Sequence, residues 1–146
     1  MSITPSAAMD TTAVSLCVDH DNCQITLRCL RDLDAESVKG NILAAYTDTK
    51  TGYQFDWLVD LSALTVPLSD SDNVELGRVW QRMAKGRDVG RRTAFVTPNP
   101  VMQSRLRQSQ AASAYRAIGV FDTVEAAQAW LKNLVDPALG DGIQLI

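Results

Sequence analysis

The chain has 146 residues, of which 46% are hydrophobic and 21% are charged, an ordinary composition for a soluble globular domain. This length suits one domain with a core of its own, so folding requires neither a metal nor a disulfide. The composition excludes collagen-like, coiled-coil and disordered chains, and no apolar run approaches the roughly 18 residues of a membrane span.

The formal net charge of −3 argues against a dedicated nucleic-acid binder. The charge is uneven, because segment 78–107 holds eight basic residues and one acidic residue, whereas the rest holds six basic and sixteen acidic residues. The segment is either a solvated helix face and turn or a docking patch for an acidic partner, a phosphate group or a neighbouring subunit. The candidate docking residues are Arg78, Arg82, Arg91 and Arg92.

Cys17, Cys23 and Cys29 form no Cys-x-x-Cys pair, and His20 is the single histidine. An odd number of cysteines does not fit a disulfide scaffold, and the local ligands are too few for zinc. We therefore expect no metal site and no cofactor. Cys17 and Cys29 fall in strand-like runs, where cysteine behaves as a small buried apolar side chain.

The start of the chain, residues 1–12, lacks the basic residues and apolar stretch of a secretory signal. We expect it to be a flexible leader, and we expect the protein to be cytoplasmic. The first predicted elements are two strands, because residues 13–18 and 24–29 alternate apolar with polar side chains. The intervening residues favour a turn. An antiparallel hairpin that pairs Val18 with Ile25 would bury one apolar face.

A helix and a central strand are predicted next. Asp34 is a suitable N-cap, and apolar residues at helical spacing carry the helix to near Thr49. The near-continuous apolar run at 55–61 indicates a strand buried on both faces. Asp60 lies near the carboxyl end of this strand, and we expect it to cap the following loop.

The second predicted helix follows a loop that ends at Asp70. Ser71 or Asp72 is the expected cap, since Asp72 has capping-box spacing to a glutamate three residues later. Gly86 or Gly90 is expected to end the helix.

Two further strands and two further helices are predicted in the remaining chain. Residues 93–96 and 117–121 have the character of short buried strands. Thr97 is the expected cap of the third helix, with Pro98 at its first position. Asp122 has capping-box spacing for the fourth helix.

The predicted order is β-β-α-β-α-β-α-β-α. Strands that alternate with helices pair in parallel through right-handed crossovers, and the opening hairpin makes the sheet mixed. We therefore predict an α/β fold, a single domain over residues 13–134 with a mixed five-stranded sheet packed by four helices. Residues 135–146 are expected to be a C-terminal tail.

Common catalytic and nucleotide-binding motifs are absent from the sequence. There is no Gly-x-Ser-x-Gly elbow, no phosphate-binding Gly-x-x-x-x-Gly-Lys loop and no Gly-x-Gly-x-x-Gly fingerprint. His20 falls in a predicted turn, far in sequence from any candidate nucleophile. Because no nucleophile, base and orienting group converge, we do not expect an enzyme.

Two sets of side chains carry candidate modification or binding chemistry. Ser69 and Ser71 precede or open a predicted helix, where a phosphate would be stabilised by free N–H groups. Serines are also good helix caps, which is the alternative interpretation. Trp57, Trp80 and Met83 fall on predicted inner faces, where they form either core or the wall of an apolar pocket.

Three stretches resemble the SpoIIAA-like family of small bacterial domains, within the STAS and Sec14-type grouping. These are residues 58–64 (Leu-Val-Asp-Leu-Ser-Ala-Leu), 91–96 and 120–131, the last with alanines before a Trp-Leu pair. The resemblance implies a mixed sheet packed by helices, and commonly self-association. In anti-sigma-factor antagonists an Asp-Ser-Ser-Gly motif opens the second helix, and its serine is phosphorylated. Here only Asp70-Ser71 matches, and the glycine is missing.

The sequence leaves two functional hypotheses. The first is a non-enzymatic, STAS-like binding or regulatory module that acts through protein–protein contacts as a homodimer. The alternative is a carrier or sensor of an apolar, lipid-like small molecule in a Sec14-type pocket. Neither involves nucleic acid or integral membrane association. An apolar pocket near Trp57, Trp80 and Met83 would favour the carrier, and an exposed apolar patch at a two-fold interface would favour the regulatory module.

Overall fold

The computed structural model describes residues 12–49, 51–112 and 116–132, and the predicted leader and tail lie outside these ranges except for Thr12. Its centre is one five-stranded sheet in the order β1-β2-β3-β4-β5. β1 and β2 are antiparallel, and the other neighbours are parallel. The predicted mixed α/β sheet is therefore confirmed. The strands are β1 (Val14–Asp19), β2 (Gln24–Cys29), β3 (Asp56–Asp60), β4 (Arg92–Val96) and β5 (Ala117–Phe121).

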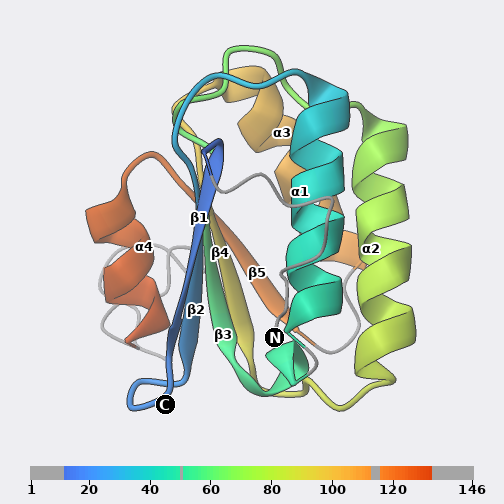
Figure 1. Ribbon diagram of the computed structural model, residues 1–146, viewed down its shortest axis with the longest axis vertical. Coiled ribbons are helices and arrows are strands. Elements are labelled where there is room, and N and C mark those ends of the chain that lie inside the picture. Colours follow the sequence, from blue (N-terminus) through green and yellow to red (C-terminus); the bar gives the residue numbers. More distant parts are fainter. Residues whose placement is uncertain (1–11, 50, 113–115, 133–146) are drawn as a thin grey trace.

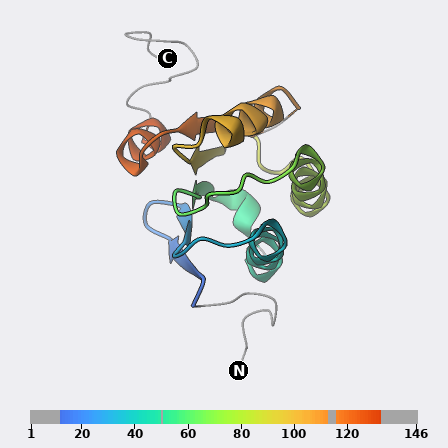
Figure 2. The same ribbon diagram turned by 90° about the horizontal axis from the view of Figure 1, so that it is seen from above.

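Four α-helices pack on the sheet, three on one face and one on the other (Figure 1). Seen from above, α4 lies on one side of the strands, and α1 and α2 lie on the other (Figure 2). Within the described ranges, every helix falls short of the length and apolar character that a bilayer crossing requires. The helices are α1 (Ala35–Asp48), α2 (Asp70–Ala84), α3 (Pro100–Ala112) and α4 (Val124–Leu131), with a short 3-10 turn η1 (Gly52–Gln54) before β3.

The hairpin has the predicted register, with Val18 opposite Ile25. The expectation for its cysteines is only half correct. Cys29 is buried, whereas Cys17 is exposed. The reason is that side chains of a strand alternate between faces. Cys29 faces the three-helix side of the sheet, while Cys17 points to the side where α4 covers β3, β4 and β5 but leaves β1 open.

The cap predicted for α2 is wrong, and Ser69 takes this role. Its hydroxyl accepts a hydrogen bond from the Asp72 N–H at 3.1 Å, so the helix begins earlier than either Ser71 or Asp72 would allow. The predicted end is also wrong, because neither Gly86 nor Gly90 is the C-cap. Lys85 ends the helix in the left-handed conformation, with φ of 52°.

The caps of the last two helices are also displaced from their predicted positions. Asn99 caps α3 by accepting hydrogen bonds from two N–H groups of its first turn at 2.9 and 3.0 Å. Thr97 is instead fully buried before the helix. Asn99-Pro100 offers the same combination of cap and first-position proline two residues later than Thr97-Pro98. For α4 the cap is Thr123 rather than Asp122.

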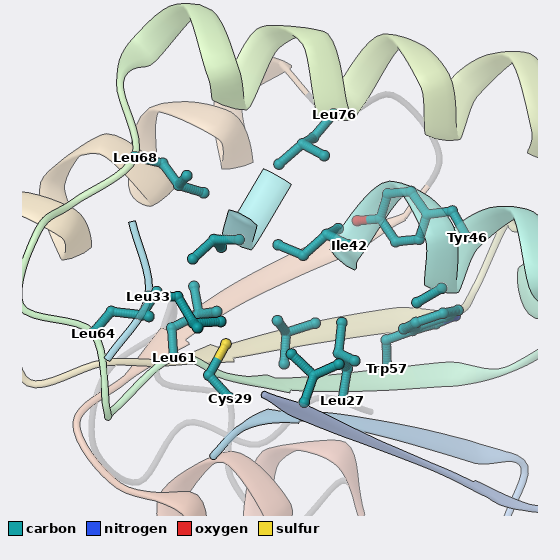
Figure 3. Packing of buried hydrophobic residues seen from close by; sticks show 14 of the residues in the cluster. Leu27, Cys29, Leu33, Ile42, Tyr46, Trp57, Leu61, Leu64, Leu68 and Leu76 are labelled. Atoms are coloured by element: carbon teal, nitrogen blue, oxygen red, sulfur yellow. The ribbon is translucent and has the colours of Figure 1, made fainter. Parts of the chain in front are cut away.

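The sheet separates two hydrophobic clusters. The larger cluster lies between the sheet and α1, α2 and α3, and Figure 3 shows part of it. The smaller cluster lies under α4. β3 contributes to both, with Trp57 in the larger cluster and Leu58 in the smaller, as the apolar run predicted. The smaller cluster consists of Leu58, Ala94, Val96, Phe121, Ala127, Trp130 and Leu131.

Candidate functional site

A cleft with a volume of about 890 Å³ lies between α2, α3 and the sheet. Its size falls within the usual range of small-molecule sites. α2 lines it along its whole length, from Asp70 to the cap residue Lys85, and α3 contributes residues near Leu106. Large apolar side chains form much of the wall: Ile42, Tyr46, Trp57, Leu61, Leu68, Val74, Leu76, Trp80, Phe95, Leu106 and Ile118.

A glycine in the middle of α2 lines the cleft. Gly77 lines the cleft, and a Cβ atom added to it would meet nothing within 4 Å. Glycine inside a helix costs roughly 1 kcal/mol relative to alanine. Gly77 therefore makes α2 less stable than alanine would, and a side chain at this position would lie in open space beside the cleft.

Three aromatic rings form part of the cleft floor. Tyr46 of α1 contacts Trp57 of β3 and Trp80 of α2 edge to face, with ring centroids 5.4 and 4.9 Å apart. Figure 3 shows the Tyr46 ring beside Trp57, on the sheet side of α2. Burial raises the pKa of the Tyr46 hydroxyl to about 12. These interlocking rings give the cleft a rigid apolar base.

A buried ion pair borders the same floor. The Arg116 Nε lies 3.1 Å from the Asp88 Oδ2, and both side chains are only 4% exposed. The same carboxylate oxygen accepts a hydrogen bond from the Trp80 Nε1 at 2.7 Å, and the guanidinium lies 4.6 Å from the Trp80 ring centroid. Arg116 also donates to the carbonyls of Phe55 and Tyr53 at 2.9 and 3.2 Å.

These contacts indicate that Arg116 and Asp88 have a structural role. Burial lowers the pKa of Arg116, and the hydrogen bond with Asp88 opposes that effect. Because its donors are directed to Asp88 and to backbone carbonyls, Arg116 ties β5 to the chain around η1 and α2. A pair of this kind acts as a structural clamp, and removing one partner leaves an uncompensated buried charge.

The rim of the cleft carries basic side chains. Arg105 of α3 donates to the Leu68 carbonyl at 2.8 Å and lies 3.9 Å from the Asp70 carboxylate. Arg78 and Lys85 also line the cleft, and their side chains have no hydrogen bond or ion pair to any described residue. The described lining contains no serine, cysteine or histidine.

The structure brings together only some of the residues that the sequence singled out for a pocket or a modification. Trp57 and Trp80 both line the cleft. Met83 packs against the larger cluster but is not part of the lining. Ser69 and Ser71 lie at the start of α2 with hydroxyls 3.1 Å apart, outside the cleft.

The four arginines proposed as a docking patch occupy different surroundings. Arg78 and Arg82 are exposed on α2. Arg91 lies 3.6 Å from the Asp56 carboxylate. Arg92 donates to the Trp130 carbonyl at 2.6 Å, under α4 on the opposite face of the sheet. The structure therefore does not gather Arg92 with the α2 arginines.

Sequence reasoning missed three residues of this site. Gly77 had a detectable signal, because a glycine inside a helical pattern often has a packing or functional reason. Asp88 had a weaker sequence signal, because it is the single acidic residue of the basic segment 78–107. Arg116 had no local sequence signal, because its ion-pair partner lies 28 residues away.

Asp60 caps the loop after β3, as predicted. Its Oδ1 accepts hydrogen bonds from the Ser62 N–H at 3.0 Å and the Ser62 hydroxyl at 2.5 Å, and its Oδ2 lies 3.3 Å from the Arg28 Nε. In the part of the chain that the structure describes, no group of histidine, cysteine and carboxylate side chains is arranged to hold a metal ion.

Comparison with known protein families finds no matching family model. Comparison with curated proteins also finds no match. Two solved structures are similar in fold. One is an uncharacterized DUF3478-family protein with a SpoIIAA-like fold from Shewanella loihica PV-4, with TM-score 0.55 and 17% identity over 82% of this chain and 92% of that chain. The other is the anti-sigma factor antagonist SpoIIAA in its unphosphorylated form, with TM-score 0.50 and 19% identity over 82% of this chain and 98% of that chain. The chain therefore has a SpoIIAA-like fold.

Proposed function

We propose that this SpoIIAA-like domain is a binding module that holds an apolar small molecule in the cleft between α2, α3 and the sheet. It acts as a carrier or sensor of that molecule. The observation that carries the proposal is the cleft itself, about 890 Å³ in volume, with Trp57 and Trp80 in its wall. The cleft lies where the sequence pattern allowed either a core or a pocket, and its volume favours the pocket.

The chemistry of the wall favours binding over catalysis. Acyl transfer and hydrolysis need a nucleophile beside a base, and the described lining offers no serine, cysteine or histidine. Its most buried charges, Asp88 and Arg116, are bound to each other and to their neighbours. Their positions are fixed by the fold, so they support the floor instead of taking part in a reaction.

The energetics of such a site favour an apolar ligand. Each Å² of apolar surface that leaves water contributes about 25 cal/mol. The floor is held by ring contacts and by the hydrogen bond from the Trp57 Nε1 to the Gly52 carbonyl at 2.9 Å. A wall that is already ordered loses little side-chain freedom when a ligand enters, so more of the burial energy appears as affinity.

The test is to place a larger side chain on a residue that lines the cleft. Gly77→Leu places a side chain in open space on α2, and Gly40→Leu makes the same change on α1, where an added Cβ also meets nothing within 4 Å but lies outside this cleft. A neutral apolar fluorophore, N-phenyl-1-naphthylamine, is titrated into each protein. We expect Gly77→Leu to weaken binding by at least about tenfold and Gly40→Leu to leave it unchanged. Equal binding by both variants, or no binding by the wild type, contradicts the proposal.

Native mass spectrometry of protein purified gently from its own host provides a second test. An additional mass that disappears on denaturation supports the carrier, and its value begins to identify the molecule. A clean, unmodified protein under the same conditions argues against a carrier that is loaded in the cell.

A regulatory module that acts through protein contacts is the second candidate. One observation favours it: Ser71 is exposed on the first turn of α2 in a fold shared with an anti-sigma factor antagonist. Self-association and a cytoplasmic location stay predictions of this candidate. Analytical ultracentrifugation tests the homodimer, since a monomer at high micromolar concentration contradicts it.

A further inference from the structure

The charged residues around the cleft are unbalanced. Four of the lining residues are basic and two are acidic. The buried Arg116 is neutralised by Asp88, and Arg105 lies near Asp70. The excess positive charge therefore belongs to Arg78 and Lys85.

Arg78 and Lys85 are placed to act on one ligand. Arg78 lies on α2 and Lys85 is its C-cap residue, so the two positions are about two turns, or roughly 10 Å, apart along the helix. Both are exposed at the mouth of the cleft. The same cleft is lined by Trp80, Trp57 and further apolar side chains. The cleft therefore combines an apolar wall with two exposed cations.

The two rim cations differ from the other basic residues of the same segment. Arg87 donates to the Ala84 and Met83 carbonyls at 2.9 and 2.8 Å, and its guanidinium lies over the Tyr53 ring. Arg92 donates to the Trp130 carbonyl. These contacts give Arg87 and Arg92 structural roles, whereas no described residue forms a hydrogen bond, ion pair or ring contact with the charged groups of Arg78 and Lys85.

Lys85 provides an independent observation. Its backbone is left-handed, with φ of 52°, at the C-cap of α2. Glycine is the usual residue there, because a Cβ atom lies too close to the following carbonyl oxygen in this conformation. A lysine at this position is therefore not the choice that backbone energy favours, and residues held in such conformations are often functional.

We propose that the ligand of this cleft is an amphipathic anion, whose apolar body lies on the aromatic floor and whose anionic head is held by Arg78 and Lys85. This inference rests on the proposed function, because it requires the cleft to be a binding site. The guanidinium offers paired N–H donors that match carboxylate and phosphate oxygens, and the ammonium adds a point charge. Each exposed charge pair of this kind changes affinity by at most about fivefold, so the head sets selectivity and the apolar body supplies most of the affinity.

The experiment compares probes that share a twelve-carbon chain and differ in the head. Dodecanoate, dodecyl phosphate, dodecanol and dodecylammonium are titrated below their micelle concentrations, with tryptophan fluorescence as the signal. Trp57 and Trp80 line the cleft, whereas Trp130 lies in the smaller cluster under α4. The signal should therefore persist in Trp130→Phe. We expect at least one of the two anions to bind about tenfold more tightly than dodecanol, and dodecylammonium to bind most weakly.

Variants that each remove one positive charge test where the anionic head of the ligand binds. Arg78→Gln and Lys85→Gln should each weaken binding of the favoured anion by up to about fivefold and leave dodecanol binding unchanged. Arg82→Gln is the control, because it removes the same charge from the same helix at a residue outside the cleft. All three positions are exposed, so the variants are expected to fold.

The outcomes separate this inference from the proposed function. Preference for dodecanoate, dodecyl phosphate or both supports the inference and distinguishes a carboxylate from a phosphate head. If dodecanol binds as tightly as both anions, or Arg82→Gln weakens anion binding as much as Arg78→Gln, the inference is overturned and the cleft remains a binding site. If no probe binds, or the signal is lost in Trp130→Phe, both the inference and the proposed function fail.

Discussion

The two faces of the sheet contain glycines with opposite surroundings. A Cβ atom added to Gly119, on β5 under α4, would lie 2.7 Å from the Phe121 ring and 3.0 Å from the Trp130 ring. A Cβ atom added to Gly77, on α2 across the sheet, would meet nothing within 4 Å. The α4 face uses a missing side chain to bring aromatic rings close, and the three-helix face uses one to leave space. One residue type thus serves packing on one face and access on the other.

The two faces also use arginine differently. Arg92 spans from β4 to the Trp130 carbonyl and lies 5.0 Å from the Trp130 ring centroid, which fastens α4 to the sheet. Arg116 fastens the other face through Asp88 and Trp80. Each face is held by a cation over a tryptophan, and beside α2 this contact borders the cleft. The α4 face thus supplies packing, while the three-helix face combines packing with the proposed binding site.

The largest expected effect is the loss of the clamp on the three-helix face. Asp88→Ala leaves the Arg116 charge buried without its partner, and we expect a loss of about 3–5 kcal/mol of unfolding free energy. Urea unfolding followed by circular dichroism measures it. Asp70→Ala is the control, because this carboxylate is 68% exposed and should cost less than about 1 kcal/mol. A cost for Asp88→Ala as small as that of the control would show that the clamp is dispensable.

An added side chain on the α4 face should lower the stability of the protein. Gly119→Ala forces its new methyl group against Phe121 and Trp130, and we expect a destabilisation of about 1–3 kcal/mol. The midpoint of urea unfolding measures this change. An unchanged midpoint would mean that the rings move aside easily, which would remove the contrast between the two faces.

On the three-helix face, a glycine-to-alanine substitution should raise the stability of the protein instead of lowering it. Gly77→Ala adds a methyl group in free space and improves the helix, so we expect a stabilisation of up to about 1 kcal/mol. Comparison with Gly119→Ala in the same unfolding assay gives the sharpest test of the two-face interpretation. A destabilised Gly77→Ala protein would indicate that the cleft is narrower than described.

A pH-dependent effect is expected for Cys29, which lies on the opposite face of the hairpin from Cys17. Burial raises the pKa of the Cys29 thiol from 9.0 to about 11, so folding favours the protonated thiol. Its contribution to stability is complete below pH 9 and is lost as the pH rises through 11. We expect the unfolding free energy to fall more steeply in the wild type than in Cys29→Ala over this range. Parallel pH profiles would contradict the assignment.

Thiol labelling provides the complementary measurement. Exposed Cys17 and Cys23 should react quickly with Ellman's reagent at pH 8, whereas buried Cys29 should react slowly. The variants Cys17→Ser, Cys23→Ser and Cys29→Ala assign each phase to its residue. Equal rates for all three cysteines would mean that the core beneath α1 opens as freely as the exposed hairpin.

Local sequence signals predicted the strands well and the helix ends poorly. The register of Val18 with Ile25 follows from alternation, because a slip by one residue would expose every apolar side chain. The helix caps were harder to predict, because serine, threonine, asparagine and aspartate all cap well and several such residues lie near each helix start. Ser69 rather than Ser71 caps α2 because its hydroxyl is the one that reaches the Asp72 N–H. That choice depends on backbone geometry beyond residue type.

The order of the elements, the mixed sheet and the burial of Trp57 could be predicted from the amino-acid sequence, because apolar periodicity and turn chemistry act over a few residues. The folded structure was needed to show that Arg116 meets Asp88, that Gly77 faces open space, and that Arg78 borders an apolar cleft while Arg92 lies under α4. These features join residues of different elements across the sheet. Their geometry is set by the packing of helices on strands, and local patterns carry no information about such distances.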